Sequence, residues 1–358
     1  DFKTPWAVRE AGIESLEHGR TRYTSNAGLK ELRAEVAKYL ERRMGLHYDP
    51  LHEVLITVGG SEAIDMCIRT LVQPGDEVII PEPCFVCYEP ITTLSGGVPV
   101  HVACRQEDEF RLRADALKAA ITPRTKLVIM PFPNNPTGAV MEREDLEAVA
   151  EVLRDTNVMV LSDEIYAELN YGLRPHVSIA TLPGMAERTI VVNGFSKTYA
   201  MTGWRLGYLI GPAEVIEGAR KVHDFLTVGA AAPLQEAAVA GLELPASYYE
   251  KLQALYTEKR DHFLAGLDRA GLKHNIPQGT YFVMIDISDF LALPQFAGWT
   301  DLEFCEWMIR EVGVAAVPGS SFFREPVNHL IRFHFAKKDE TLLEALNRLE
   351  QLKAKIPS

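Results

Sequence analysis

The sequence predicts an α/β protein, with a mostly parallel seven-stranded sheet sandwiched by helices and a smaller α+β part. Seven short runs are apolar almost throughout, which is typical of strands that are covered on both faces. These runs occupy residues 54–58, 78–80, 98–102, 127–132, 158–161, 189–192 and 206–210. Amphipathic stretches separate several of the runs, and this alternation indicates parallel strands joined by helical crossovers.

Two helices are predicted directly from side-chain spacing. In residues 142–154 the apolar residues Leu146, Val149 and Leu153 recur at the spacing of one helix face. Residues 29–44 show a similar pattern after a turn-like segment.

The pattern changes after Pro212. Long helices are predicted at 246–270 and 341–355, and strands with alternating polarity at 281–287 and 330–335. Alternation indicates strands with only one buried face, so the second part of the chain is predicted to be an α+β unit.

The charge balance excludes some partners. Lys and Arg number 37 against 49 Asp and Glu, a formal net charge of −12. Long-range repulsion then argues against nucleic acid or an anionic membrane as the main partner. No apolar run reaches the roughly 20 residues of a membrane helix, and Asp1 opens no signal-peptide pattern.

The cysteine pattern predicts a reduced protein. The five cysteines are scattered, at Cys67, Cys84, Cys87, Cys104 and Cys305. An odd number in a chain of 358 residues favours a reducing compartment, so we expect a cytoplasmic protein. Cys84 and Cys87 form a C-x-x-C pair, but no second pair or histidine cluster completes four ligands. We therefore expect ordinary thiols and no metal site.

Candidate binding groups follow the predicted strands, where ligands of open α/β sheets bind. The run 54–58 leads into Gly59-Gly60-Ser61-Glu62 and the start of a helix, which together could cradle a phosphate. The spacing fits neither the P-loop nor the dinucleotide fingerprint, and a tight turn explains the glycines equally well.

Two ionisable residues come directly after buried runs. Asp163 follows 158–161, either as a cap for the next turn or as a charge aimed at a ligand cation. Lys197 follows 189–192, where desolvation would lower the pKa of a lysine towards that of a useful base or nucleophile.

Further polar residues lie in similar places. Asn134 and Asn135 follow 127–132, where they serve either a rigid turn or a ligand. Arg205 lies among apolar neighbours, and Arg332 lies within a predicted strand, where an outward-facing position is the alternative.

These motifs together resemble those of the class I and II aminotransferases, which are fold-type I pyridoxal-phosphate-dependent enzymes. The resemblance covers the whole chain, and its segments follow the family's order: Tyr23 with Gly28 and Leu32-Arg33, Gly60-Ser61-Glu62, Asn135-Pro136-Thr137-Gly138, Asp163-Glu164-Ile165-Tyr166, Ser196-Lys197-Thr198 and Gly203-Trp204-Arg205-Leu206-Gly207. It implies an aspartate aminotransferase-like fold with pyridoxal 5′-phosphate as the cofactor. It also implies a large cofactor-binding domain over 29–240 and a small domain formed by 1–28 and 241–358.

The resemblance assigns catalytic roles. Lys197 would hold the cofactor as a Schiff base and then move the proton between the substrate Cα and the cofactor C4′. Asp163 would pair with the protonated pyridine nitrogen. Tyr166 and Asn135 would hydrogen-bond the cofactor O3′.

The same resemblance assigns binding roles. Phe85 would stack on the cofactor ring, and Arg332, with Asn135, would bind the substrate carboxylate. Tyr23 would reach the phosphate in the neighbouring subunit, which implies a homodimer with shared active sites. The residues expected at the phosphate of the same chain are Gly60, Ser61, Glu62 through its backbone, Ser196 and Arg205.

The implied activity is transfer of an amino group between an L-amino acid and a 2-oxo acid by a ping-pong mechanism. Residues 279–282 and 317–322 look most like the branch that acts on aromatic amino acids, kynurenine, glutamine or methionine. Between Lys221 and Lys251 the only basic residue is His223, which disfavours a dedicated aspartate enzyme. Family members carry residues before the segment that opens this chain, and we expect a lid segment to be missing there.

Two other functions stay open. A carbon–sulfur β-lyase acting on a cystathionine-like substrate would use the same Lys197 and Asp163. A non-catalytic, cofactor-binding regulator would need an attached interaction segment, and these residues show none.

Overall fold

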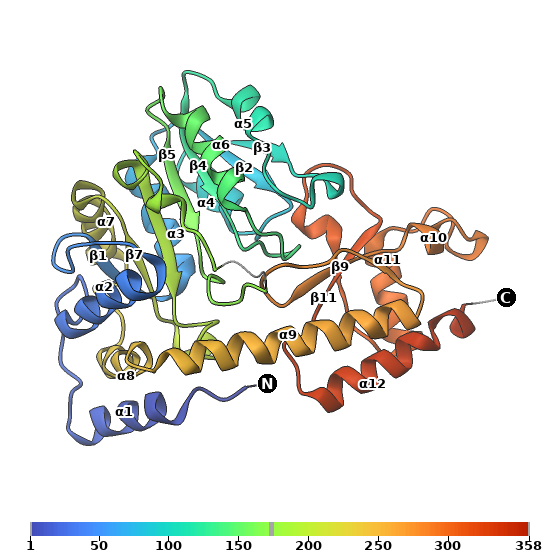
Figure 1. The fold of residues 1–358 in the computed structure, drawn as a ribbon. Helices are drawn as coiled ribbons and strands as arrows, with labels where there is room; N and C mark the ends of the chain where they lie inside the picture. Colours follow the sequence, from blue (N-terminus) through green and yellow to red (C-terminus); the bar gives the residue numbers. More distant parts are fainter. Residues whose placement is uncertain (1, 172–174, 357–358) are drawn as a thin grey trace.

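The computed structural model describes residues 2–171 and 175–356, and its main feature is a seven-stranded sheet (Figure 1). The strand order is β1-β7-β6-β5-β4-β2-β3. Strand β7 runs antiparallel to β1 and β6, and the other pairs are parallel. The strands are β1 (Val54–Thr57), β2 (Glu77–Glu82), β3 (Val98–Ala103), β4 (Thr125–Met130), β5 (Met159–Asp163), β6 (Thr189–Gly194) and β7 (Gly207–Ile210). Each lies on one of the seven predicted runs, which confirms the predicted sheet.

Helices cover both faces of this sheet. Successive strand residues point to opposite faces, so neighbours in sequence enter different cores. Val128 packs in one core with Val149 of α6, and Leu127 packs in the other with Ile68 of α3. The helices of this part are α2 (Lys30–Met44), α3 (Gly59–Leu71), α4 (Tyr88–Leu94), α5 (Ala114–Ala120), α6 (Arg143–Leu153), α7 (Ala213–Leu226) and α8 (Ala232–Leu242).

A second, antiparallel sheet has the order β10-β11-β9-β8. The long helix α9 runs from beside α8 towards this sheet, and α12 packs along its far half (Figure 1). The strands are β8 (Lys273–His274), β9 (Phe282–Asp286), β10 (Val317–Pro318) and β11 (Leu330–His334), and the helices are α9 (Ala246–Arg269), α10 (Ser288–Leu291), α11 (Asp301–Trp307) and α12 (Asp339–Glu350). The predicted α+β character of this part is confirmed.

The last predicted helix is divided in the structure. Helix α12 ends at Glu350, and a short 3-10 helix follows at Leu352–Lys355. Leu349 and Leu352 are both buried, and a 3-10 turn brings residues three apart onto one face.

Helix α1 (Trp6–Glu17) packs mainly on α8. Its Val8 belongs to the core that contains Leu32 and Tyr208, whereas Phe2 contacts Tyr256 on α9. The division into domains at 29–240 stays a prediction. No helix in the described part of the chain is long and apolar enough to cross a membrane.

A pair of glycine substitutions tests the packing of α9 on α12. A Cβ added at Gly266 would lie 2.9 Å from Leu346 Cγ, whereas one added at Gly12 meets nothing closer than 3.4 Å. We expect Gly266→Ala to lower the free energy of unfolding by about 1–2 kcal/mol, since overpacking outweighs the gain in helix propensity.

The control, Gly12→Ala, should leave the free energy of unfolding unchanged or raise it by up to about 1 kcal/mol. Urea denaturation measures both values. A Gly266→Ala protein as stable as the parent would contradict this packing.

Candidate active site

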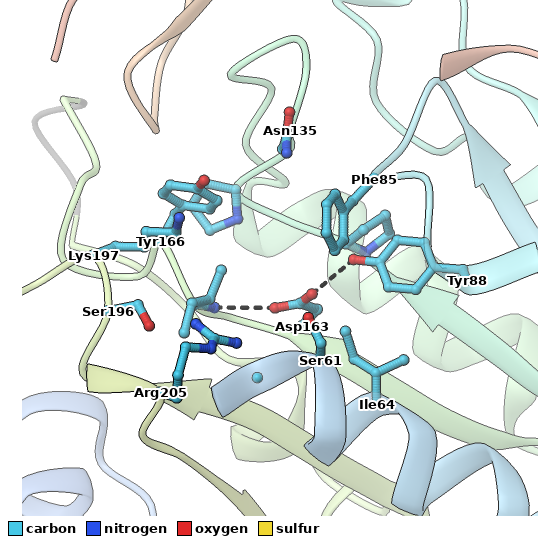
Figure 2. Close-up of a pocket in the computed structure, with 14 residues that line it drawn as sticks. Ser61, Ile64, Phe85, Tyr88, Asn135, Asp163, Tyr166, Ser196, Lys197 and Arg205 are labelled. Carbon is cyan, nitrogen blue, oxygen red and sulfur yellow. Dashed lines mark hydrogen bonds between the residues drawn. The ribbon is translucent and has the colours of Figure 1, made fainter. Parts of the chain in front are cut away.

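The predicted site residues gather in a pocket at the carboxyl ends of the central strands (Figure 2). Most of the side chains proposed from sequence lie on its walls, although they come from distant parts of the chain. The lining residues are Gly60, Ser61, Ile64, Phe85, Tyr88, Pro131, Pro133, Asn135, Asp163, Ile165, Tyr166, Ser196, Lys197 and Arg205.

One end of the pocket is built to bind an anion. Helix α3 begins at Gly59, so its first N–H groups are free of helical partners. A Cβ at Gly59 would lie 2.9 Å from Arg205 Cζ, so the guanidinium lies directly against the helix start. Arg205 itself has a left-handed backbone (φ 54°), a conformation that non-glycine residues rarely adopt, and it donates from Nη1 to Thr202 O at 2.8 Å.

The side chain of Glu62 stabilises the start of this helix. It contacts His223 Nδ1 at 3.0 Å and accepts hydrogen bonds from the Thr227 hydroxyl and the Val58 N–H. Burial acts to raise the pKa of Glu62, but the hydrogen bonds from His223, Thr227 and Val58 outweigh it and the pKa lies below its ordinary value. The carboxylate thus fixes the first turn of α3, and it does not line the pocket.

Asp163 is the last residue of β5, the central strand of the sheet, and only 8% of it is exposed. Its Oδ2 accepts a hydrogen bond from the Tyr88 hydroxyl at 2.7 Å, and Oδ1 accepts one from the Ile165 N–H at 3.3 Å. Burial raises the pKa of Asp163, while the bond from Tyr88 is the largest opposing cause. One oxygen therefore caps the following turn, and the carboxylate also lines the pocket, while its pairing with a ligand cation stays a prediction.

Lys197 and Tyr166 lie side by side on the wall of the pocket that is opposite Phe85 and Tyr88 (Figure 2). Lys197 Nζ is 5.6 Å from the centre of the Tyr166 ring and 6.0 Å from that of Tyr281. Burial raises the pKa of Tyr166 well above its ordinary value, with Tyr281 and the hydrogen bond to it acting in the same direction, so the phenol is protonated.

The two adjacent asparagines have separate tasks. Asn134 is buried, and its amide donates to the carbonyls of Pro83 and Pro131, both at 3.2 Å. Its oxygen accepts from the Thr137 N–H and hydroxyl, so Asn134 holds the loop. Asn135 instead lines the pocket.

Arg332 connects the small sheet to this pocket. Its Nη1 donates to Asn135 Oδ1 at 2.6 Å. Its guanidinium lies 4.2 Å from the ring centre of Phe282 and 4.7 Å from that of Phe322, so aromatic faces hold it from two directions. Burial lowers the pKa of Arg332 from its ordinary value. Arg332 is not itself one of the residues that line the pocket, but its side chain reaches Asn135, which is, so the outward-facing alternative does not describe it.

One expected contributor lies away from the pocket, and one residue that was not expected lies on its wall. Tyr23 is 93% exposed and lies outside the pocket of its own chain. Tyr88 lines the pocket but was not predicted from the sequence. A usable signal was its place three residues after Phe85, where it is the first residue of α4.

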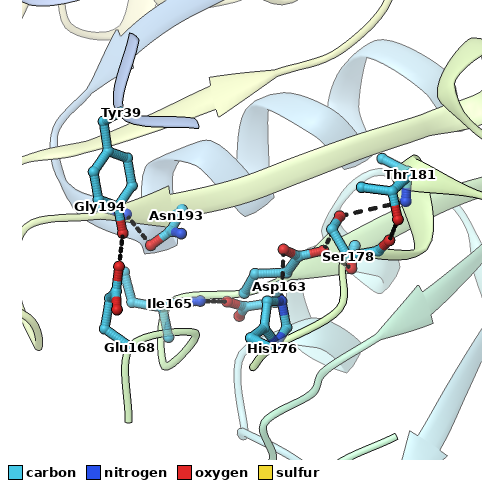
Figure 3. Close-up of polar contacts among 12 residues, drawn as sticks. Tyr39, Asp163, Ile165, Glu168, His176, Ser178, Thr181, Asn193 and Gly194 are labelled. Carbon is cyan, nitrogen blue, oxygen red and sulfur yellow. Dashed lines mark hydrogen bonds and ion pairs between the residues drawn. The ribbon is translucent and has the colours of Figure 1, made fainter. Parts of the chain in front are cut away.

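Behind the pocket, two further carboxylates are buried (Figure 3). Glu164 contacts His176 Nε2 at 2.9 Å and accepts hydrogen bonds from the Ser162 and Ser178 hydroxyls. These contacts hold Glu164, which directly follows the last residue of β5.

Glu168 accepts a hydrogen bond from the Tyr39 hydroxyl at 2.8 Å and pairs with Arg43. Neither carboxylate lines the pocket.

The two cysteines of the C-x-x-C pair are thiols whose pKa is raised by burial, Cys84 and Cys87 alike. No group of three metal-ligating side chains lies within residues 2–171 and 175–356.

Comparisons with known proteins agree with one another. The family described as aminotransferase class I and II matches residues 1–349. A Bacillus subtilis protein named YugH, provisionally described as an aminotransferase, is 43% identical over 351 residues, covering 98% of this chain and 89% of its own. The aromatic-amino-acid aminotransferase 2 of Thermococcus litoralis is 39% identical over 357 residues, covering 98% and 89%.

A solved structure shows the same fold. The aromatic aminotransferase of Pyrococcus horikoshii superposes with a TM-score of 0.93 at 38% identity, covering 100% of this chain and 95% of its own. The fold is that of the aspartate aminotransferases, whose Thermus thermophilus member superposes with a TM-score of 0.91 at 36% identity. The chain therefore belongs to the class I and II aminotransferases and is an aminotransferase.

Proposed function

We propose that this chain is a pyridoxal-phosphate-dependent aminotransferase that exchanges an amino group between an L-amino acid and a 2-oxo acid. The observation that carries the proposal is the convergence of three charged groups on one pocket. Asp163 lies at its floor, Lys197 on its wall and Arg205 at the start of α3. These groups match, in order, a protonated ring nitrogen, an aldehyde and a phosphate.

The donor set fits pyridoxal 5′-phosphate. Free N–H groups at the start of α3, with Ser61, Ser196 and Arg205, suit a phosphate dianion. A buried carboxylate at Asp163 suits a cationic N–H of a flat ring, and Phe85 offers an aromatic surface for stacking.

When bound, pyridoxal phosphate supplies an electron sink for the pair of electrons left on the substrate Cα. The protein residues do the rest. Asp163 would hold a proton on the ring nitrogen, and Tyr166 and Asn135 would donate hydrogen bonds to the ring oxygen. The amine of Lys197 would hold the cofactor at its aldehyde carbon and, when free, would take and return the proton of the substrate Cα.

Arg332 is proposed to bind the substrate α-carboxylate. A guanidinium presents two parallel donors, which match the two oxygens of a carboxylate. The aromatic rings of Phe282 and Phe322 restrict the side chain, so little rotational freedom is lost on binding.

We propose an aromatic, glutamine-like or methionine-like amino acid, or a broad range of these, as the donor. Among the described residues, Lys197 and Arg205 are the basic side chains on the pocket wall, and both are assigned to the cofactor. Relatives named for aromatic amino acids, methionine and kynurenine support this class, although a Pyrococcus abyssi relative is named aspartate aminotransferase.

A homodimer with shared active sites belongs to the same proposal. Tyr23 is almost fully exposed, as is Phe225, which is 90% exposed at the end of α7. A second subunit that covers this region would bring Tyr23 towards the partner's phosphate site. The cytoplasmic location stays a prediction, supported by five free thiols.

Replacing the lysine tests the proposed cofactor chemistry. We expect Lys197→Ala to lose the visible absorbance of the lysine-bound cofactor and to lower kcat by on the order of 10²–10⁴-fold or more, because it removes the proton carrier. The control is Lys221→Ala on the exposed face of α7, which should match the parent. Undiminished turnover in Lys197→Ala would refute the mechanism.

The substrate carboxylate site is tested by two variants of Arg332. We expect Arg332→Ala to raise KM for the amino acid by about 10–100-fold, the loss of a hydrogen bond to a charged group, while cofactor binding stays nearly unchanged. The KM of Arg332→Lys should fall between those of the parent and Arg332→Ala, because lysine keeps the charge but lacks the two parallel donors of the guanidinium. Equal KM values in all three proteins would show that the carboxylate binds elsewhere.

A single-turnover experiment separates transfer from β-elimination. We expect the enzyme with aromatic or sulfur-containing amino acids to release one equivalent of 2-oxo acid and to retain the amino group on the cofactor. Pyruvate and ammonia from a cystathionine-like substrate would instead identify a carbon–sulfur lyase. The same assay over aromatic, acidic and branched donors measures the preferred class.

A further inference from the structure

We propose that Tyr88 is a positioning residue for Asp163, which holds that carboxylate ionised and oriented towards the ring nitrogen of the cofactor. The inference rests on the proposed function, because it concerns how this chain prepares its own carboxylate for pyridoxal phosphate.

Three observations identify Tyr88. It is 2% exposed, it lines the pocket, and its hydroxyl donates to Asp163 Oδ2 at 2.7 Å (Figure 2). Its ring meets Phe85 edge to face, with centres 6.1 Å apart. One short segment therefore places both the expected stacking ring and the hydrogen-bond donor of the carboxylate.

The direction of this hydrogen bond is fixed by chemistry. Burial raises the pKa of Tyr88 well above its ordinary value, so the phenol keeps its proton and donates the hydrogen bond, which the carboxylate of Asp163 accepts. A donor this close favours the ionised carboxylate over the neutral acid. The other charges near Asp163 are Lys197, which also favours ionisation, and Glu164, which opposes it.

The geometry also leaves room for a ligand. Tyr88 occupies Oδ2, while the Ile165 N–H reaches Oδ1 only at 3.3 Å. With both oxygens held from within the protein, the carboxylate plane is set before the cofactor arrives. A ring N–H can then approach a remaining lone pair without reorganisation.

The test compares two buried tyrosines that each donate to a buried carboxylate. Tyr88→Phe removes the donor to Asp163, and Tyr39→Phe removes the donor to Glu168 at 2.8 Å, which lies away from the pocket. Pyridoxal phosphate is titrated into the apo-form of each protein between about pH 6 and 8.5, and Kd is measured by fluorescence quenching.

We expect Tyr88→Phe to raise Kd by about 10–100-fold, the range of a hydrogen bond to a charged group. The increase in Kd should grow as the pH falls, because without the Tyr88 hydroxyl the carboxylate of Asp163 becomes protonated at a higher pH. Tyr39→Phe should stay within about twofold of the parent at every pH. In an Asp163→Asn background, Tyr88→Phe should change Kd by less than about twofold.

Several outcomes would overturn the inference. These are a Kd for Tyr88→Phe equal to that of Tyr39→Phe, an increase that does not vary with pH, or an undiminished effect in the Asp163→Asn background. Failure of Tyr88→Phe to fold while Tyr39→Phe folds would show a role in the core instead. If the unaltered chain does not bind pyridoxal phosphate, the proposed function itself fails.

Discussion

The burial of one carboxylate at the end of the central strand is the constraint on which the site depends. A charged Asp163 inside the sheet costs several kcal/mol unless it is paired and hydrogen-bonded. Tyr88 and the Ile165 N–H satisfy part of this demand, and Lys197 adds an attractive charge. The remaining capacity of the carboxylate to accept hydrogen bonds faces the pocket, where a cationic ring N–H would use it. The proposed reaction also needs a protonated ring, so the same contact would both stabilise the buried carboxylate and serve the reaction.

The second sheet enters the site through a single polar link. Arg332 on β11 donates to Asn135, which follows β4 of the large sheet. The rings of Phe282 and Phe322 hold the guanidinium in place, so its position is already set for the proposed binding of the substrate carboxylate. Substrate binding at Arg332 would then act on the loop that contains Asn135, the proposed donor to the cofactor oxygen.

Much of this arrangement was predictable from the sequence, for physical reasons that also explain what was not. Continuous apolar runs located all seven strands, and residues directly after them, such as Asp163 and Lys197, had to reach one edge of a parallel sheet. Tyr88 could not be found this way, since it is 75 residues from Asp163 and its role arises only from tertiary contact. Local sequence also cannot decide that Asn134 holds the loop while Asn135 faces Arg332, because adjacent residues differ only in the direction of their side chains.

The most direct test of the account is chemical mapping of the lysine. The full chain is incubated with pyridoxal phosphate, reduced with borohydride to fix any imine as a stable bond, digested and analysed by mass spectrometry. The account predicts near-stoichiometric labelling of the peptide that contains Lys197, and loss of that label in Lys197→Ala. Labelling spread over surface lysines, or stoichiometric label on another lysine, would contradict the assignment of this pocket as the cofactor site.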